Sequence, residues 1–185
     1  MTDPALLARI DRLESRHAIA ELVALYCKAC DDRDVPLLRS LFTADAAIRS
    51  HDGMMNAEGI DAVMTMYAGR FSVLGLSVHW THDAIVRFDD GDPDAATGEV
   101  FCHAEAHRAG TTLVGSLRYG DAYRREGGRW MFARRVLAFG YYVPVTEYAE
   151  AMGSTLRQRA YGDRRPADYP ETLESWDGWR AHFPG

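Results

Sequence analysis

Tyr26, Asp31 and His79 are the residues of this sequence best suited by type to acid–base chemistry. A histidine imidazole changes its charge near neutral pH, so His79 could remove a proton from carbon. A tyrosine hydroxyl can donate a hydrogen bond to an oxygen that gains charge, and a buried carboxylate can fix the tautomer of a histidine. These residue types therefore indicate proton transfer on a small molecule. A histidine with only structural contacts is the alternative interpretation of His79.

Tyr26 and Asp31 close a long helical pattern at the start of the chain. Ile19 and Leu22 recur with Tyr26 at three- and four-residue spacing, which predicts a helical face turned to a core. The carboxylate of Asp31 then lies either in water or in a cavity, and the pattern leaves both open. Tyr26 and Asp31 are about 140° apart around an ideal helix. They can serve one site if the helix frays near Cys30 or if a ligand lies between them, and plain core filling is the alternative for Tyr26.

The elements around these residues predict an α+β domain. Helical patterns cover residues 5–33, 35–42 and 60–71, and strand-like stretches cover 46–51, 77–89, 97–108, 112–126 and 129–142. Helices followed by hairpin-linked strands favour an antiparallel sheet with helices on one face, and glycines within the strands suit a sheet bent into a cone. We expect residues 1–144 to form this domain. Residues 145–185 should add a helix to about Tyr161 and a tail that packs on the domain or on a neighbouring subunit.

Strict alternation along the strand predicted over residues 77–89 places Ser77 and His79 on one face. Trp80, Val86 and Phe88 then share the other, more apolar face. A polar pocket lining explains this pattern, and so does a solvent-exposed face.

Composition and missing motifs exclude several partners. A net charge of −6 and a pI near 5.6 argue against nucleic acid, because phosphate binding needs a concentrated positive field. No apolar run reaches membrane-spanning length and the first residues do not resemble a signal peptide, so we expect no membrane partner. Three cysteines without a paired spacing favour a reduced, cytoplasmic protein. The chain has no phosphate-binding glycine loop, nucleophile elbow or dinucleotide fingerprint, so we expect no cofactor.

Histidine spacing does not predict a metal site. His79 and His82 point to opposite faces of a strand, and His103 and His107 would lie about 13 Å apart along one face. We therefore expect no metal.

Several motifs resemble the SnoaL-like branch of the nuclear transport factor 2-like superfamily. They are Tyr26-x-x-x-x-Asp31-x-x-Asp34, Leu38-x-x-Leu41-Phe42-x-x-Asp45-Ala46, His79-x-x-x-Asp83 and Gly128-Arg-Trp130-x-Phe-x-x-Arg135. The resemblance spans residues 8–142. It implies a cone-shaped antiparallel sheet wrapped around N-terminal helices, in a homo-oligomer that is a trimer or a dimer.

Enzymes of this branch include scytalone dehydratase, bile acid 7α-dehydratase and hexachlorocyclohexane dehydrochlorinase, which place a histidine–aspartate pair in a cone-shaped pocket. The resemblance maps this pair onto His79 and Asp31, and bile acid dehydratase has a tyrosine where Tyr26 stands. Asp83 departs from the asparagine common in the family, and it would add negative charge to the pocket if it reached it. A third pocket position could fall on Cys102, His103 or Glu105.

The resemblance and the residues together predict a cofactor-independent lyase that performs a dehydratase-type elimination on a small polycyclic or ring-shaped carbonyl compound. His79 is the expected base, Asp31 orients it, and Tyr26 binds the oxygen that gains charge. Arg135, His103 and Trp80 are the candidate substrate-binding residues. Arg135 could instead pair with an acid. An isomerase, a polyketide-type cyclase and a non-catalytic ligand-binding or assembly module are the alternatives.

Overall fold

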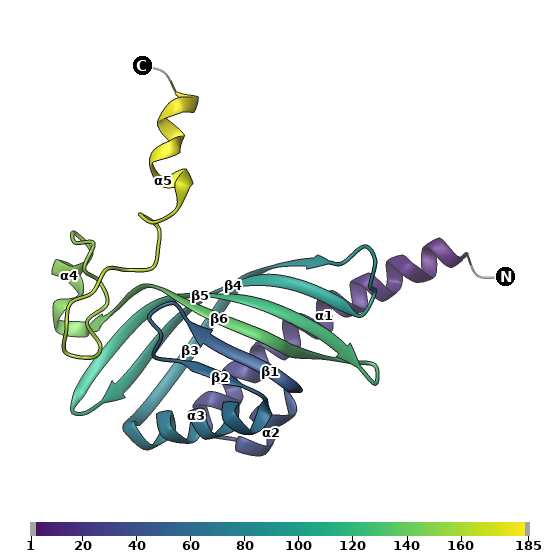
Figure 1. Cartoon of the computed structure of the whole chain (residues 1–185), viewed down its shortest axis with the longest axis horizontal. Coiled ribbons are helices and arrows are strands. Elements are labelled where there is room, and N and C mark those ends of the chain that lie inside the picture. Colours follow the sequence, from purple (N-terminus) through teal and green to yellow (C-terminus); the bar gives the residue numbers. More distant parts are fainter. Residues whose placement is uncertain (1–2, 184–185) are drawn as a thin grey trace.

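Three helices fill the concave side of the fold in the computed structural model, which describes residues 3–183 (Figure 1). They are α1 (Pro4–Asp31), α2 (Val35–Ser40) and α3 (Ile60–Val73). The Asp3 carboxylate caps α1 by accepting the Ala5 backbone N–H at 2.9 Å, and Asp34 caps α2 in the same way. Helix α1 stays unbroken to Asp31, and α2 ends at Ser40, two residues earlier than the pattern predicts.

Six strands form one curved sheet in the order β2-β1-β6-β5-β4-β3. The strands are β1 (Phe42–Ser50), β2 (Asn56–Glu58), β3 (Leu74–Phe88), β4 (Ala95–Arg108), β5 (Thr111–Glu126) and β6 (Arg129–Pro144). Strands β3 to β6 pair in antiparallel fashion, as predicted. Strand β1 joins β6 in parallel, a pairing that the local pattern does not reveal because it connects segments far apart in the chain. The expected α+β cone is confirmed.

The strict alternation expected along β3 is wrong beyond Thr81, because the strand contains a bulge there. Thr81 pairs with Cys102 and Ala84 pairs with Val100, so three residues of β3 advance against two of β4. One extra residue inverts which side chains face inward. Val86 and Phe88 therefore pack against the core on the same side as His79. The outward-facing Trp80 does not share their face, and it is 47% exposed.

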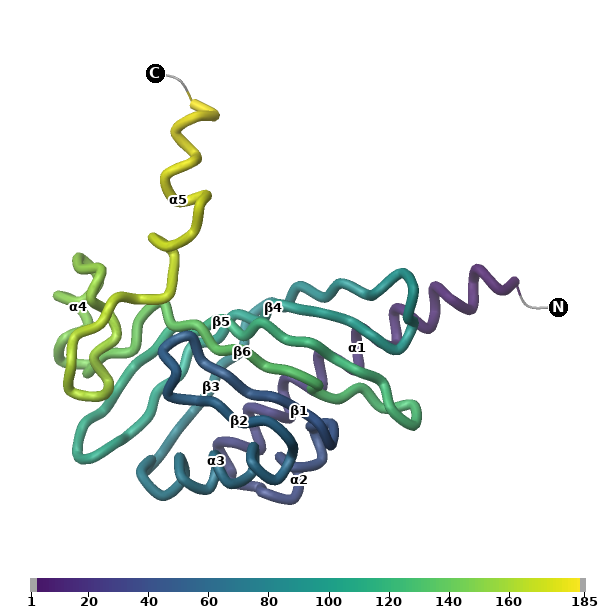
Figure 2. Tube along the Cα trace, viewed as in Figure 1, coloured from purple at the N-terminus to yellow at the C-terminus, as the bar shows by residue number. Residues whose placement is uncertain are grey.

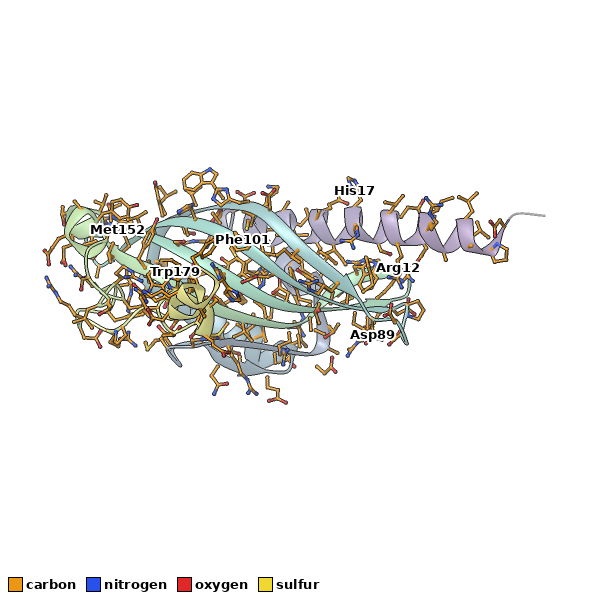
Figure 3. All side chains as sticks on the ribbon, turned by 90° about the horizontal axis from the view of Figure 1, so that it is seen from above. Arg12, His17, Asp89, Phe101, Met152 and Trp179 are labelled. Atoms are coloured by element: carbon orange, nitrogen blue, oxygen red, sulfur yellow. The ribbon has the colours of Figure 1, made fainter. Side chains whose placement is uncertain are left out.

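The core lies between α1 and the concave face of the sheet. Ile19, Leu22 and Tyr26 of α1 are all at most 5% exposed, and the ring of Tyr26 packs edge-on against Tyr119 and Phe132 from β5 and β6. This buried stripe is the one that the helical spacing predicts. Seen from above, the first turns of α1 extend beyond the strands, and the side chain of His17 points away from the sheet (Figure 3).

The expected C-terminal helix to Tyr161 is wrong. Helix α4 (Tyr148–Ala151) follows the 3₁₀ turn η1 (Val145–Glu147) and ends ten residues before that position, and residues 152–173 are irregular. The backbone here bonds partly to β6: the Tyr142 N–H donates to the Arg157 carbonyl, and the Arg159 N–H donates to the Tyr142 carbonyl, both at 2.8 Å. Within the segment, Gln158 and Arg165 exchange backbone hydrogen bonds that belong to a β-bridge and not to a helix. Long-range pairing therefore outweighs the helical preference.

The last described residues leave the body of the protein as an arm, α5 (Glu174–Gly178) and η2 (Trp179–His182), which the tube in Figure 2 shows clearly. Trp176, Trp179 and Phe183 on this arm are 47%, 51% and 72% exposed. Before the arm, the ring of Tyr169 packs so closely on Gly140 that a Cβ there would lie 2.9 Å from it. None of the helices within residues 3–183 has the length and apolar character needed to cross a membrane.

Candidate active site

Asp31 and His79 meet where the end of α1 faces the start of β3. The Asp31 Oδ1 atom lies 2.6 Å from Nδ1 of His79, and its Oδ2 atom accepts the backbone N–H of His79 at 2.8 Å. The hydroxyl of Ser77 donates to Oδ1 at 3.3 Å. The two side chains are 18% and 20% exposed. The carboxylate therefore has a donor on each oxygen, and its orientation is set by the backbone of the strand that carries the histidine.

Arg33 fastens together the two elements that supply this pair. It follows α1 with a positive φ of 55°, which turns the chain back after the helix. Its guanidinium donates to the carbonyls of Leu74 and Gly75, at 2.5 and 2.7 Å. Leu74 and Gly75 begin β3, so this contact holds the helix end and the strand start in register and limits drift between Asp31 and His79.

The geometry determines the proton arrangement on His79. An ionised carboxylate can only accept hydrogen bonds, so the proton of a neutral imidazole lies on Nδ1, next to Asp31. The Nε2 atom then carries a lone pair, and no residue among 3–183 forms a hydrogen bond with it. When Nε2 takes up a proton, the adjacent carboxylate stabilises the imidazolium that results. This is the arrangement of a general base.

A cavity opens beside His79, between α1, α3 and the concave face of the sheet. It holds about 640 Å³ of space not filled by atoms, its open mouth included. Most of its walls are apolar or aromatic, which suits a ring-shaped ligand. The lining residues are Tyr26, Cys30, Met55, Tyr67, Arg70, Phe71, Leu74, Ser77, His79, Ala104, Glu105, Ala106, Leu117, Tyr119, Leu137, Phe139 and Tyr142.

Two tyrosine hydroxyls meet inside this cavity. Tyr26 of α1 and Tyr67 of α3 are both 3% exposed, and their hydroxyl oxygens lie 2.8 Å apart. Burial raises the pKa of both, and the nearby Cys30 raises both further, so the two hydroxyls keep their protons. One hydroxyl donates to the other, which leaves the second free to donate to a ligand oxygen. Such a chain strengthens the terminal donor.

Tyr67 is not among the candidate functional residues predicted from the sequence. The available signal was its position on the apolar face of the helix predicted over residues 60–71, one turn after Val63. A hydroxyl on a core-facing stripe needs a buried partner, and Tyr26 was a second such hydroxyl. Only the packing of α3 against α1 reveals that the two are partners.

The three candidate substrate-binding residues are not among those that line the cavity. Trp80 is on the outer face of the sheet. His103 is also on the outer face, where its Nδ1 lies 2.8 Å from Nε2 of His82. Arg135 is fully buried and binds both carboxylate oxygens of Asp121, at 2.8 and 2.7 Å. The structure thus brings Asp31, His79 and Tyr26 to one place and leaves the other three outside it.

Arg135 lies behind Tyr26. Its guanidinium carbon is 4.1 Å from the centre of the Tyr26 ring and 4.3 Å from that of Tyr119, and its Nη1 has no partner among the described residues. The cation faces the rings that wall the cavity and holds them through cation–π contacts.

The three residues considered for a third pocket position separate clearly. Cys102 is buried inside the cone, where the hydroxyl of Tyr119 lies 3.6 Å from its sulfur, whereas His103 faces outward. Glu105 borders the cavity, but it is exposed and its side chain lies on the same face of β4 as that of His103, because the pairing with β5 is regular between them. Asp83 is exposed. Residues 3–183 contain no cluster of three or more histidine, cysteine or carboxylate side chains suited to a metal ion.

Comparison with known structures supports the fold. LinA has a TM-score of 0.70 and 21% identity over 75% of this chain and 94% of its own. A protein from Novosphingobium aromaticivorans that is provisionally named a scytalone dehydratase has a TM-score of 0.68 and 19% identity over 74% of this chain and 91% of its own. The hexachlorocyclohexane dehydrochlorinase LinA-type3 from Novosphingobium barchaimii has a TM-score of 0.66 and 20% identity over 74% of this chain and 94% of its own. Comparison with curated protein sequences gives no match.

Comparison of the sequence with protein-family models identifies the family. Residues 11–136, which include Tyr26, Asp31 and His79, match the SnoaL-like domain. The match begins within α1 and ends within β6, so it covers all the lining residues of the cavity except Leu137, Phe139 and Tyr142. Together with the cone-shaped fold, it shows that the chain belongs to the SnoaL-like domain family, within the nuclear transport factor 2-like superfamily.

Proposed function

We propose that this protein is a cofactor-independent lyase that eliminates water, or a similar leaving group, from a ring-shaped carbonyl compound. The observation that carries the proposal is the 2.6 Å contact between Asp31 and Nδ1 of His79 at the wall of an aromatic cavity. That contact leaves Nε2 free to act as a base on a bound ligand.

The proposed reaction begins at the carbon next to the substrate carbonyl. Nε2 of His79 takes a proton from that carbon, and the electron pair of the broken C–H bond moves toward the carbonyl oxygen to form an enolate. The free hydroxyl of the Tyr26–Tyr67 pair donates a hydrogen bond to this oxygen as it gains charge. Asp31 stabilises the imidazolium during this step.

Collapse of the enolate completes the elimination. The electron pair on the enolate oxygen re-forms the carbonyl, the pair of the enolate double bond forms the new double bond to the next carbon, and the hydroxyl on that carbon departs with the electrons of its C–O bond. The proton on Nε2 of His79 joins this hydroxyl, so water leaves and the imidazole returns to its starting form. Substrate is thereby converted to an unsaturated carbonyl compound and water, with no net change in the protein.

Names of similar structures support small-molecule lyase chemistry in this fold. One is called a hexachlorocyclohexane dehydrochlorinase and another is provisionally called a scytalone dehydratase, and both names describe elimination. Identities near 20% do not transfer a substrate, so the proposal depends on the dyad and the cavity of this chain.

An isomerase or cyclase is the nearest second function, because the same base and the same tyrosine pair would serve it. It would return the proton to carbon or form a new ring bond, with no leaving group. A non-catalytic binding or assembly module would need neither the 2.6 Å contact nor the free Nε2.

The test is a panel of β-hydroxyketones with steroid-like and polyketide-like rings, followed by ultraviolet absorbance of the new conjugated double bond. We expect turnover by the wild type and a loss of about a hundred- to ten-thousandfold in His79→Ala, the usual contribution of a general base. His82→Ala is the matched control, since it removes an exposed histidine from the same strand. A His79→Ala variant that remains folded and turns over at the wild-type rate rules out this mechanism.

A further inference from the structure

Arg70 is the sole arginine or lysine among the residues that line the cavity in the described part of the chain. It comes from α3, three residues after Tyr67, so both side chains leave the helix on the same side. Arg70 is partly buried, and its neighbours are the tyrosine side chains of Tyr161, Tyr142 and Tyr26. A guanidinium therefore reaches the space that holds the proposed base.

The charge of Arg70 has no carboxylate partner within residues 3–183. No carboxylate oxygen of this range lies within 4.0 Å of its nitrogens. The protein pairs its well-buried arginines differently: Arg135 with Asp121 at 2.7 Å, and Arg157 with Glu171 at 2.6 Å. Withdrawing a cation from water costs free energy unless an anion or hydrogen-bond acceptors replace the water. Arg70 lacks such a carboxylate and faces an open cavity.

A second arginine lies in a neighbouring hollow. This hollow shares Arg70, Leu74 and Tyr142 with the cavity and is also lined by Arg108 and Tyr161. The Arg108 guanidinium carbon lies 4.7 Å from the centre of the Tyr161 ring, and Nη1 donates to a backbone carbonyl at 3.2 Å. No carboxylate oxygen of residues 3–183 lies within 4.0 Å of Arg108 either. Arg70 and Arg108 thus place two positive groups in this neighbouring hollow, and Arg70 also lines the cavity that contains His79.

The negative groups near the cavity are placed differently. Asp31 already accepts hydrogen bonds on both oxygens beside His79, and the exposed Glu105 side chain lies on the outer face of β4. An anionic ligand group would be repelled by Asp31 and attracted by Arg70. Charge alone therefore orients a ligand with its anion toward α3, and with its apolar body toward the aromatic wall and His79.

We propose that the substrate carries an oxyanion, a carboxylate or a phosphate, which Arg70 binds with support from Arg108. This inference rests on the proposed function, because it assigns the polar group that positions the ring against His79. A planar guanidinium matches both oxyanions through paired N–H donors. The substrate class becomes a cyclic hydroxyketone with an acidic side group. Arg70 acts by binding and orienting, and takes no part in proton transfer.

The experiment compares 2-naphthoate with its neutral isostere 2-naphthamide by isothermal titration calorimetry. Wild-type protein should bind the naphthoate about ten- to a hundredfold more tightly, the range given by one charge-assisted hydrogen-bonded pair. Arg70→Gln should remove this preference, and Arg70→Lys should retain part of it because the charge remains. Arg134→Gln, an exposed arginine of β6, is the matched control and should behave as wild type. Thermal melts establish that each variant is folded.

A second titration distinguishes a carboxylate from a phosphate as the oxyanion of the substrate. Tighter binding of 2-naphthyl phosphate than of 2-naphthoate assigns a phosphate, the reverse assigns a carboxylate, and both support the proposal. Equal affinity for naphthoate and naphthamide, no saturable binding of either anion, or a full preference in folded Arg70→Gln overturns it. The His79→Ala variant should keep the charge preference while it loses turnover. Failure of the charge preference and failure of the proposed reaction are therefore distinguishable.

Discussion

Asp31→Asn should disable the base although asparagine has the same size and shape as aspartate. In the wild type, Oδ2 accepts the backbone N–H of His79 at 2.8 Å, and Oδ1 faces Nδ1 at 2.6 Å. A backbone N–H can only donate, so the single amide oxygen of asparagine must occupy the Oδ2 position. The amide NH₂ then faces Nδ1 of His79 and forces it to accept. The ring proton moves to Nε2, the atom that has to act as the base.

The magnitude follows from two losses. The wrong tautomer removes general-base catalysis, worth about a hundred- to ten-thousandfold, or about 3–5 kcal/mol of the barrier at about 1.4 kcal/mol per tenfold. The missing charge also reduces the stabilisation of the His79 imidazolium by about 1.5–3 kcal/mol, the value of a charge-assisted hydrogen bond. Both losses act on the same proton transfer, so they do not add. We expect kcat/KM to fall by about a hundred- to ten-thousandfold, with the fold preserved.

Two measurements test this reasoning. Enzyme assays on the substrate identified by the panel should show the loss in Asp31→Asn, a normal rate in Asp32→Asn, and no further loss when Asp31→Asn is added to His79→Ala. Nitrogen-15 NMR should find the His79 proton on Nδ1 in the wild type and on Nε2 in Asp31→Asn. Asp32 is the control because it is the neighbouring exposed carboxylate and has the same charge. A normal rate in Asp31→Asn, or an unchanged tautomer, would refute the argument.

Three other changes probe the surroundings of the dyad. Tyr26→Phe should lower kcat by about tenfold to a hundredfold because it breaks the 2.8 Å hydroxyl pair, and kinetics showing an unchanged kcat would count against an oxyanion role. Asp121→Asn leaves the fully buried Arg135 without its counter-charge, so urea unfolding should show a loss of about 3–5 kcal/mol, against under about 1 kcal/mol for the exposed Asp45→Asn. We also propose a homo-oligomer, trimer or dimer, in which the exposed aromatic arm contacts a second copy. Deletion of residues 174–185 removes the arm and leaves the Arg157–Glu171 pair intact, so it should lower the mass found by light scattering, and a wild-type monomer at micromolar concentration would contradict this proposal.

Local patterns in the sequence determined most of the helices and strands. The spacing of Ile19, Leu22 and Tyr26 depends only on the helical repeat, so the buried face of α1 could be read directly. The hairpin strands β3 to β6 could also be predicted from the sequence, because the loops between them carry turn residues and each strand pairs with the next one along the chain. Asp31 and His79 could be named from residue type and family resemblance alone.

Only the tertiary structure decided what these residues do together. The 2.6 Å contact joins positions 48 residues apart, and beside it Arg33 ties the end of α1 to the start of β3. The bulge after Thr81 reverses the inward face of β3, a change that alternation cannot anticipate. The placement of Tyr67 and Arg70 at the cavity, on which their proposed roles depend, likewise follows from how α3 packs against its neighbours, since a side chain's partner is set by packing between elements rather than by the spacing within one.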